Sequence, residues 1–396
     1  MLRRLHLRPD WQIALAITLL LRVFYSTFAA FAAIAQHPQA SLVRSNAFAQ
    51  TLPSSSGLHY ALLGIWGRFD TLWYLRIAAR GYDLPASVVF YPLYPALIRF
   101  VSYLVEPVAA ALLVSTIASF FYFLGLLRLA RREAPDVLPL RVLALAAVWP
   151  ASFFLFAAYT EALAMALIVW SIAQARDENW LSAAFCALAA GLTRSAGTLL
   201  IVPLLVIAFG AWLRVSSRAV SRTPPRPESP ARRPPSNIAR WSVFLAPLGT
   251  LAYWLWLRET GRPRIASAYR LYWDTQVAAP WTTLWQAILA LFHRFQPLLA
   301  ISFAALILFF IAGVLARRRM EDRCFSLAVI LHLLLRVCSP PLFGAPRYLL
   351  PIYPAYLTFG RWANKMSRAR FIFLCMGLFA CNLGWLWAFL NWSLVL

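Results

Sequence analysis

Charged residues are scarce in this sequence, and their scarcity decides the class of protein. Of 396 residues only 13% are charged, while 62% are hydrophobic. Soluble domains carry about 25% charged and about 45–50% apolar residues. The chain lacks the polar side chains needed to coat a water-soluble globule of this size. The composition therefore excludes an ordinary soluble domain and predicts an integral membrane protein.

Negative charge is the scarcer sign: 14 acidic residues stand against 37 Lys and Arg, for a net charge of +23. In a soluble protein this balance would point to a nucleic-acid partner. Here the basic residues interrupt long apolar runs, and the sequence has neither a basic recognition helix nor zinc-finger spacing. We therefore expect no nucleic acid, and instead basic loops on the cytoplasmic side of a membrane, where anionic lipid attracts them.

Paired cysteines are lacking too. The five cysteines form no Cys-x-x-Cys motif and lie in or beside apolar segments. This placement is typical of small buried side chains rather than of disulfides or a zinc site. Clustered carboxylates that could clamp a metal ion are not evident in the loops expected outside the membrane. We expect neither a metal nor another cofactor.

Long apolar runs, in contrast, are abundant. They predict about eleven membrane helices, several of them short. The first run is too long for the core of a cleaved signal peptide and is expected to remain as an anchor. If sides alternate from a cytoplasmic start, more than half of the basic residues fall inside, in line with the positive-inside rule. The runs cover residues 11–35, 108–127, 142–158, 161–174, 181–193, 198–213, 241–257, 298–315, 324–338, 349–360 and 371–391.

Three loops of the predicted bundle have distinctive compositions. Residues 216–236 are rich in Pro, Arg and Ser, which predicts a disordered cytoplasmic linker, either a spacer or a docking site. Residues 36–103 and 259–296 mix aromatic, Gly, Pro and charged residues and should be structured outer loops, with 281–295 lying flat at the interface. Residues 1–396 are thus expected to form a single all-α integral membrane domain, a polytopic helical bundle that works at its outer face.

Few acidic residues fall on or near the outer side, and these are the candidates for acid–base chemistry. Asp70 stands where a helical pattern begins, so it either caps that helix or acts as a general base. Glu161 follows Tyr159 and Thr160, and it either caps a helix or holds a substrate or an arginine. The outer acids are Asp70, Asp83, Glu106, Glu161, Glu259 and Asp274, whereas Glu133, Asp136, Asp177, Glu178, Glu228, Glu321 and Asp322 are assigned to cytoplasmic loops.

Arginines and aromatic residues near the same outer turns could bind a phosphorylated substrate. Arg194, Arg336 and Arg347 lie near the outer ends of apolar runs, and a guanidinium presents a planar fork of donors that suits phosphate. Each could equally be a snorkelling or structural arginine. The segment 90–95, Phe-Tyr-Pro-Leu-Tyr-Pro, contains Tyr91 and Tyr94 and is either an interfacial elbow or one wall of an acceptor groove.

These motifs occur in one order along most of the chain. The set resembles the PIG-V-type mannosyltransferases, the family of the enzyme that adds the second mannose to GPI anchors, together with its bacterial relatives. That family usually has Trp-Asp where this chain has Phe-Asp, and Ser-Asn-Gly where it has Ser-Ala-Gly, so the acceptor could differ. The matching blocks are Phe69-Asp70, Phe90 to Pro95, Ala158 to Leu163, Thr193 to Gly197, and Pro346-Arg347-Tyr348 through Pro354.

The resemblance implies a GT-C-type membrane glycosyltransferase with a cavity at its outer face. The donor would be a polyprenyl-phosphate sugar carrying a hexose, with mannose expected, and the acceptor a glycan, glycolipid or protein. Asp70 would be the general base of an inverting transfer, and Arg194, Arg347 and Arg270 would stabilise the leaving phosphate. The family's spread favours a bacterial inner membrane with an extracytoplasmic site. Further substrate contacts are expected from Glu161, Tyr159, Tyr91 and Tyr94.

Two other functions fit parts of the sequence. A lipid-linked sugar transporter or flippase also needs phosphate-binding arginines, and Arg22 would be its ionisable group at mid-membrane. The sequence has no internal repeat and no paired helices broken by Gly or Pro, which weighs against this reading. A non-catalytic assembly protein would use the linker 216–236 as its contact surface.

Overall fold

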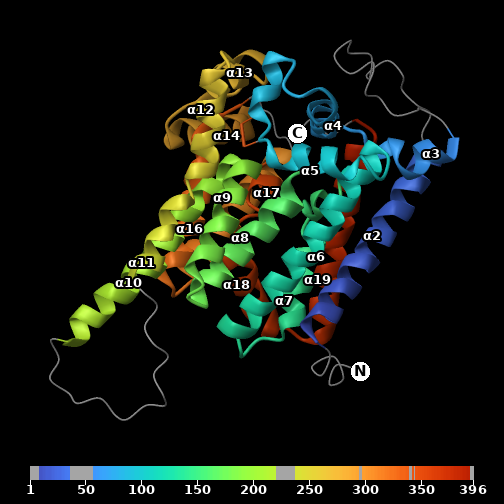
Figure 1. Ribbon diagram of the computed structural model, residues 1–396. Helices are drawn as coiled ribbons and strands as arrows, with labels where there is room; N and C mark the ends of the chain where they lie inside the picture. Colours follow the sequence, from blue (N-terminus) through green and yellow to red (C-terminus); the bar gives the residue numbers. More distant parts are fainter. Residues whose placement is uncertain are drawn as a thin grey trace.

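The computed structural model describes residues 9–35, 57–219, 237–293, 297–338, 341–342 and 344–392. Within these ranges the chain is helical almost throughout. Its strands there are β1 (Gln276–Val277) and β2 (Arg336–Val337), which form one short antiparallel ladder. Figure 1 shows the helices side by side as a bundle, with α4, α5 and α13 at one end and α7 and α18 at the other. The predicted all-α class is confirmed.

Among the described residues, four helical segments are long and apolar enough to cross a membrane. All four also expose large apolar side chains, such as Leu20 (71% exposed) and Phe373 (80%). Rows of such side chains are unfavourable in water and suit contact with lipid. The structure is thus consistent with a membrane protein, while the number of about eleven spans remains a prediction. The four segments are α2 (Asp10–Ala35), α6 (Pro107–Glu133), α15 (Pro297–Phe310) with the π-helical turn η6 (Ile311–Leu315), and α19 (Arg368–Leu390).

Shorter helices make up the rest of the bundle, and prolines mark several of their ends. The expected run 142–158 divides around Pro150, and the run 241–257 divides around Pro247. Proline has no amide hydrogen and disfavours helix in the residue before it. The two runs become α7 (Pro139–Val148), η3 (Ser152–Leu155), η5 (Trp241–Leu245) and α12 (Leu248–Glu259). The others are α8 (Glu161–Arg176), α9 (Trp180–Thr193), η4 (Ser195–Leu200), α10 (Ile201–Ala219), α11 (Asn237–Arg240), α16 (Met320–Leu334), α17 (Ala345–Tyr348) and α18 (Tyr353–Asn364).

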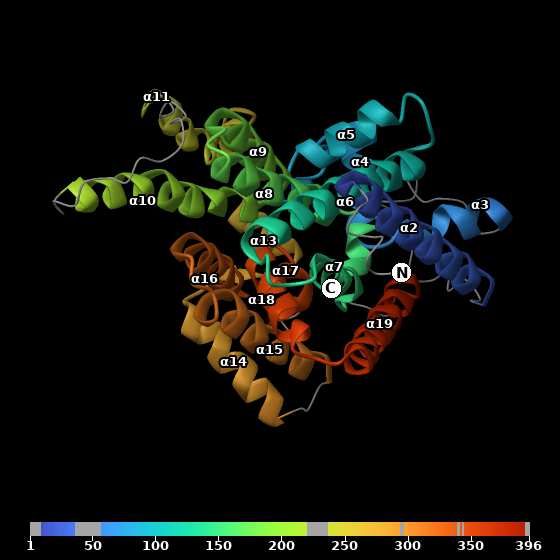
Figure 2. The ribbon, with the colours of Figure 1, turned by 90° about the horizontal axis from the view of Figure 1, so that it is seen from below.

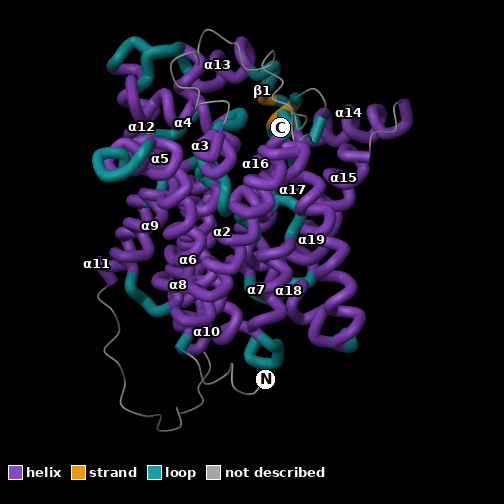
Figure 3. The backbone as a smooth tube through the Cα atoms, turned by 90° about the vertical axis from the view of Figure 1, so that its right-hand side faces the viewer, coloured by secondary structure: helices purple, strands orange, loops and turns teal. Residues whose placement is uncertain are grey.

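The two segments expected as outer loops are folded where they are described. Figures 1 and 3 place α4 and α13 at the same end of the bundle, and Figure 3 shows β1 there too. The pairing of β1 with β2 ties the second segment to the chain that leads into α17. The first segment forms α3 (Gly57–Leu62), η1 (Gly64–Trp66), α4 (Asp70–Arg80), η2 (Pro85–Val89) and α5 (Leu93–Val101), and the second forms α13 (Ile265–Tyr272), β1 and α14 (Pro280–His293).

The structure describes only the first four residues of the expected linker 216–236. Helix α10 continues to Ala219, so residues 216–219 are helical. The predicted boundary at residue 216 is too early, because Ser and Arg are tolerated in a helix and the first prolines of the segment are Pro224 and Pro225. Residues 220–236 lie outside the described ranges, as do the basic head 1–8 and residues 36–56 of the first outer segment.

Helix α8 lies against α6 and α9 inside the bundle, and Figure 2 shows the three helices from below. It is buried on most of its surface, including its first residue, Glu161, and its last, Arg176. Because an α-helix rises 1.5 Å per residue, these charged ends are about 22 Å apart. Each end lies in a separate cluster of buried ion pairs, and the candidate site is built on the Glu161 end.

Candidate active site

Asp70 is the first residue of α4, and the residue before it is strained. Phe69 has φ +46° and ψ −119°, a conformation that is costly for any residue with a Cβ atom. Its ring packs against Phe389 and Trp392, with centroids 5.6 and 4.9 Å away. The carboxylate of Asp70 points to a neighbouring helix, because its Oδ2 accepts a hydrogen bond from Nη2 of Arg347 at 2.9 Å.

Four charged residues form the outer cluster: Asp70, Glu161, Arg194 and Arg347. Arg347 bridges Asp70 and Glu161, and Arg194 forms a second ion pair with Glu161. The side chains of Glu161 and Arg347 are 2% and 5% exposed, whereas that of Asp70 is 22% exposed. Oδ1 of Asp70 makes no hydrogen bond to any described residue. Asp70 is therefore the carboxylate of this cluster that a substrate can reach.

Aromatic rings hold Arg347 in place. Its guanidinium carbon lies 4.8 Å from the ring centroid of Phe154 and 4.6 Å from that of Tyr159, close enough for cation–π attraction. The hydroxyl of Tyr159 also accepts a hydrogen bond from the backbone nitrogen of Asp70 at 3.2 Å. Tyr159 is fully buried. Tyr159 therefore contacts both partners of the Asp70–Arg347 ion pair. The sequence predicted instead that Tyr159 contacts the substrate directly.

A small cavity lies beside the outer cluster. Its volume is about 80 Å³, room for about two or three water molecules. Sites for small-molecule ligands measure about 300–1,000 Å³, so a sugar phosphate needs the walls of this cavity to move apart. The polar side chains lining it include Asp70, Arg194, Ser195, His332, Arg336 and Arg347.

Arg336 gives the cavity a positive charge that no described carboxylate offsets. Its guanidinium carbon lies 5.1 Å from the ring centroid of Tyr269 and 4.7 Å from that of Tyr348. In contrast, Arg194 and Arg347 are paired with carboxylates of the outer cluster. From the sequence, Arg336 is one of the arginines that could bind phosphate, but it is not among the predicted substrate contacts. The reason is that the apolar run 324–338 continues past it and places it inside a predicted membrane helix. Helix α16 in fact ends at Leu334.

A histidine also lines the cavity, although no sequence signal indicated it. Nε2 of His332 lies 3.0 Å from the hydroxyl oxygen of Ser195. Both residues are part of the cavity wall, so this hydrogen bond joins α16 to η4 across it. His332 sits alone in an apolar run, a context more typical of a core residue than of a site, and only the fold brings it to Ser195.

Of the other expected site residues, Tyr91 lines the cavity, whereas Tyr94 and Arg270 do not. Tyr94 is buried and donates a hydrogen bond to the carbonyl of Ala111. Arg270 is exposed on α13, whereas its neighbour Tyr269 lines the cavity. The prediction for Arg270 rests on its charge alone. Successive residues of a helix point in directions about 100° apart, so Tyr269 faces the cavity and Arg270 does not.

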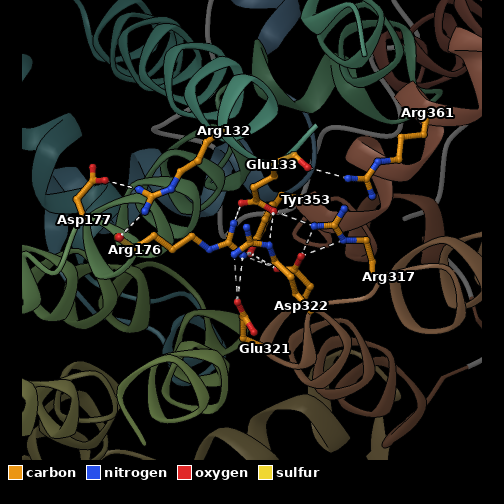
Figure 4. A network of polar contacts seen from close by, with 10 residues as sticks. Arg132, Glu133, Arg176, Asp177, Arg317, Glu321, Asp322, Tyr353 and Arg361 are labelled. Carbon is orange, nitrogen blue, oxygen red and sulfur yellow. Dashed lines mark hydrogen bonds and ion pairs between the residues drawn. The ribbon is translucent and has the colours of Figure 1, made fainter. Parts of the chain in front are cut away.

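A second set of buried charges, the inner cluster, lies at the other end of α8 (Figure 4). Its core members are Glu133, Arg176, Arg317 and Asp322, and neither carboxylate has any exposed surface. Asp322 accepts hydrogen bonds from Nη2 of Arg176 (2.8 Å), Nε of Arg317 (2.9 Å) and the hydroxyl of Tyr353 (2.7 Å). The sequence assigned Glu133 and Asp322 to cytoplasmic loops, and the structure corrects this: neighbouring arginines allow both to be buried.

No group of three or more His, Cys, Asp or Glu side chains that could hold a metal ion occurs among the described residues. The charged side chains that line the cavity are Asp70, Arg194, Arg336 and Arg347, and guanidinium groups bind anions. The chemistry that these residues offer is recognition of a phosphate together with proton transfer to a carboxylate.

Comparison of the chain with models of protein families, with curated proteins and with solved structures found no match. The fold and site define an all-α protein whose described part contains four helices suited to a membrane and a charged cavity at one end. The resemblance to PIG-V-type mannosyltransferases stays a prediction from the sequence, and the function has to be argued from the geometry of the site.

Proposed function

We propose that the chain is a membrane glycosyltransferase. It moves a hexose, expected to be mannose, from a polyprenyl-phosphate donor to a hydroxyl of a glycan, glycolipid or protein acceptor. The observation that carries the proposal is the position of Asp70, a partly exposed carboxylate at a cavity whose other charged side chains are arginines. A carboxylate suits the proton of an acceptor, and arginines suit the phosphate of a donor.

The proposed reaction is a single displacement with inversion. The acceptor oxygen bonds to the anomeric carbon of the donor while Asp70 takes the hydroxyl proton. The bond from that carbon to the phosphate oxygen breaks, and its electron pair leaves with the polyprenyl phosphate. A phosphate leaving group needs cationic stabilisation more than it needs a proton. The proton on Asp70 passes to water when the products leave.

The geometry supports a division of labour among the arginines. Attacking and leaving oxygens lie on opposite sides of the anomeric carbon in a displacement, so the base and the phosphate-binding group must be apart. Arg347 touches Asp70 directly and is suited to positioning the base. Arg336 lines the same cavity without a carboxylate partner among the described residues, so we assign it to the leaving phosphate.

Binding of the donor would have to open the site. With a volume of about 80 Å³, the cavity admits a phosphate group but not a sugar beside it. The acceptor and donor would separate Asp70 from the opposite wall of the cavity. The buried ion pairs of Glu161 with Arg194 and Arg347 would keep Arg347 in place, and Arg347 would keep Asp70 in position. The site would face the extracytoplasmic side of a bacterial inner membrane.

The transporter alternative is disfavoured by the contacts of Arg22. Its Nη1 donates to the carbonyl of Phe156 at 2.6 Å, and its Nε donates to the hydroxyl of Ser26 at 3.1 Å. Its guanidinium carbon also lies 4.9 Å from the ring centroid of Trp66. These contacts join α2 to its neighbours. Nη2 of Arg22 is buried without a hydrogen-bond partner among the described residues, but Arg22 does not line the cavity, so it is not placed to bind a substrate there.

A transfer assay tests the proposal. Purified full-length protein is incubated with radiolabelled polyprenyl-phosphate mannose and a panel of glycan, glycolipid and peptide acceptors, and covalent product is separated from donor. The proposal predicts labelled acceptor. Movement of the donor across vesicles without covalent product would favour a flippase, and neither product nor movement would favour an assembly protein.

Asp83 supplies a matched control for Asp70. It is also a partly exposed carboxylate paired with one arginine, Arg76, at 2.7 Å, but it does not line the cavity. Asp70→Asn should abolish labelled product, and Asp83→Asn should leave it near the wild-type level. Equal losses in both variants would mean that Asp70 has no special role.

A further inference from the structure

A second, larger cavity lies at the end of the bundle opposite the outer cluster. Its volume is about 620 Å³, within the range of ligand sites. It lies between the turn that leads from η6 into α16, the last part of α18 and the turn before α7, near the side of the inner cluster drawn at Arg317 and Arg361 in Figure 4. We call it the basic cavity, because its charged lining residues are Arg317, Arg318, Arg319, Arg361, Lys365 and Asp136.

The positive charge of the basic cavity exceeds what the nearby carboxylates can neutralise. Five cations and one carboxylate line it. Adding the buried charges behind the wall, Arg176 with Glu133, Glu321 and Asp322, still leaves six cations against four acids. Burial and the like charges of Arg317 and Arg318 lower the pKa of Arg361. Cations held this close to one another are unfavourable unless an anion lies among them.

One arginine of the wall also has an unused donor. The side chain of Arg317 is only 2% exposed. Two of its nitrogens bind Asp322 and Glu133, but its Nη1 is buried with no hydrogen-bond partner among the described residues. A buried unpaired donor costs about 1–3 kcal/mol. The outer site makes no use of these residues, which lie near the far end of α8.

We propose that the basic cavity binds a phosphate group, carried either by an anionic phospholipid or by a soluble phosphate. The guanidinium groups of Arg317 and Arg361 would form the inner wall of this site, and the exposed side chains of Arg318, Arg319 and Lys365 would close around the anion. Guanidinium groups bind phosphate through paired, charge-assisted hydrogen bonds. The site is independent of glycosyl transfer and would exist in a transporter or an assembly protein as well.

Two binding measurements on the full-length protein distinguish the sources of the phosphate. In the first, inorganic phosphate is titrated into protein in phosphatidylcholine nanodiscs by calorimetry, at an ionic strength held constant with sodium chloride. In the second, native mass spectrometry counts the phosphatidic acid retained from nanodiscs of phosphatidylcholine and phosphatidic acid. Binding in the first measurement supports a soluble phosphate, and selective retention in the second supports a lipid headgroup. Binding in neither overturns the proposal.

Matched variants separate this site from a general effect of charge. Arg318→Gln/Lys365→Gln removes two exposed cations from the cavity, and Arg323→Gln/Arg370→Gln removes two exposed cations that do not line it. The first pair should weaken binding by about tenfold or more, and the second should leave it unchanged. Equal losses in both would overturn the proposal.

A third variant is predicted to bind the anion more tightly than wild type. Asp136→Asn removes the carboxylate that lines the cavity and should strengthen anion binding by about two- to fivefold, since a like charge at this distance repels the ligand weakly in water. A gain in affinity cannot come from loss of folding. Weaker binding in Asp136→Asn would contradict the proposal.

Discussion

The outer and inner clusters are built from the same types of side chain but differ in how far these are exposed and paired. Each combines two carboxylates with two arginines, and each lies at one end of α8. In the inner cluster both carboxylates have no exposed surface, and each is shared between Arg176 and Arg317. In the outer cluster Glu161 is shared in the same way between two arginines, but Asp70 is partly exposed and has one.

The difference lies in how completely the charges are matched. A buried carboxylate with two arginines and a tyrosine, such as Asp322, is held ionised and out of reach, so its effect is on folding. Asp70 keeps one oxygen without a partner in the described structure, beside a cavity and after a strained residue. Strain and incomplete pairing are typical of groups that react. We therefore assign stability to the inner cluster and chemistry to the outer one.

The largest effect on stability should come from Asp322→Asn. This change leaves Arg176 and Arg317 buried with too little negative charge, which costs about 3–5 kcal/mol of unfolding free energy. Thermal unfolding of the purified protein measures it. Asp177→Asn is the matched control, because the Arg132–Asp177 pair at the edge of Figure 4 is about half exposed and should matter by less than about 1 kcal/mol. Similar losses of stability in the two variants would show that the buried ion pairs stabilise the fold no more than an exposed one does.

The pH dependence of the same variant sharpens this prediction. Burial alone would raise the pKa of Asp322, but Arg176 and Arg317 together hold it below its ordinary value. The folded pKa is therefore lower than the unfolded one, about 3.9, so the stabilisation is complete above that pH and is lost as the pH falls toward the folded pKa. The gap in stability between wild type and Asp322→Asn should be constant near neutral pH and narrow below about pH 3.9. A difference in stability between wild type and Asp322→Asn that grows in acid would contradict this prediction.

The next effect in size concerns the cation of the outer site. Arg336→Gln removes the charge assigned to the leaving phosphate and should lower kcat/KM by about a hundredfold. Stability should fall less than in Asp322→Asn, because Arg336 has no carboxylate partner among the described residues and loses only its contacts with Tyr269 and Tyr348. Steady-state transfer assays measure the rate, with Arg270→Gln, on the exposed face of α13, as a control expected to match wild type. A loss in Arg270→Gln and none in Arg336→Gln would restore the assignment made from sequence.

The smallest effect tests the strain beside Asp70. Phe69→Ala and Phe69→Gly both remove the ring that packs on Phe389 and Trp392, but only glycine adopts a φ of +46° at low cost. The glycine variant should therefore be more stable than the alanine variant by about 1–2 kcal/mol. Thermal unfolding of the pair measures the difference. Equal stability, or a more stable alanine variant, would show that the turn carries no strain.

The sequence predicted the class of fold well because hydrophobic runs are a local signal. It also singled out Asp70, Glu161, Arg194 and Arg347, each beside a turn near the outer end of an apolar run. It could not predict that Arg347 bridges two of them, because the ion pair with Asp70 spans 277 positions of the chain. Contacts at that separation depend on how the helices pack, which periodicity does not contain.

The errors have a common physical source. Arg336 was counted within a membrane run and Arg270 was preferred, because apolar composition does not show where α16 ends. Glu133 and Asp322 were placed in loops because arginines surround them in the sequence. Of those arginines, Arg317 is a partner of Asp322, whereas the partners of Glu133 lie far from it in the sequence, on α8 and in the turn before α16. Pairing is what permits burial of a charge.

The most direct test of the account measures rate and stability on the same samples of Asp70→Asn and Asp322→Asn. Loss of a general base costs about 10²–10⁴-fold in rate. The side chain of Asp70 is 22% exposed, whereas that of Asp322 has no exposed surface, so Asp70→Asn should cost less stability than Asp322→Asn. We predict that Asp70→Asn stops transfer and still folds, and that Asp322→Asn is the more strongly destabilised of the two. Wild-type transfer by a folded Asp70→Asn protein would contradict the account.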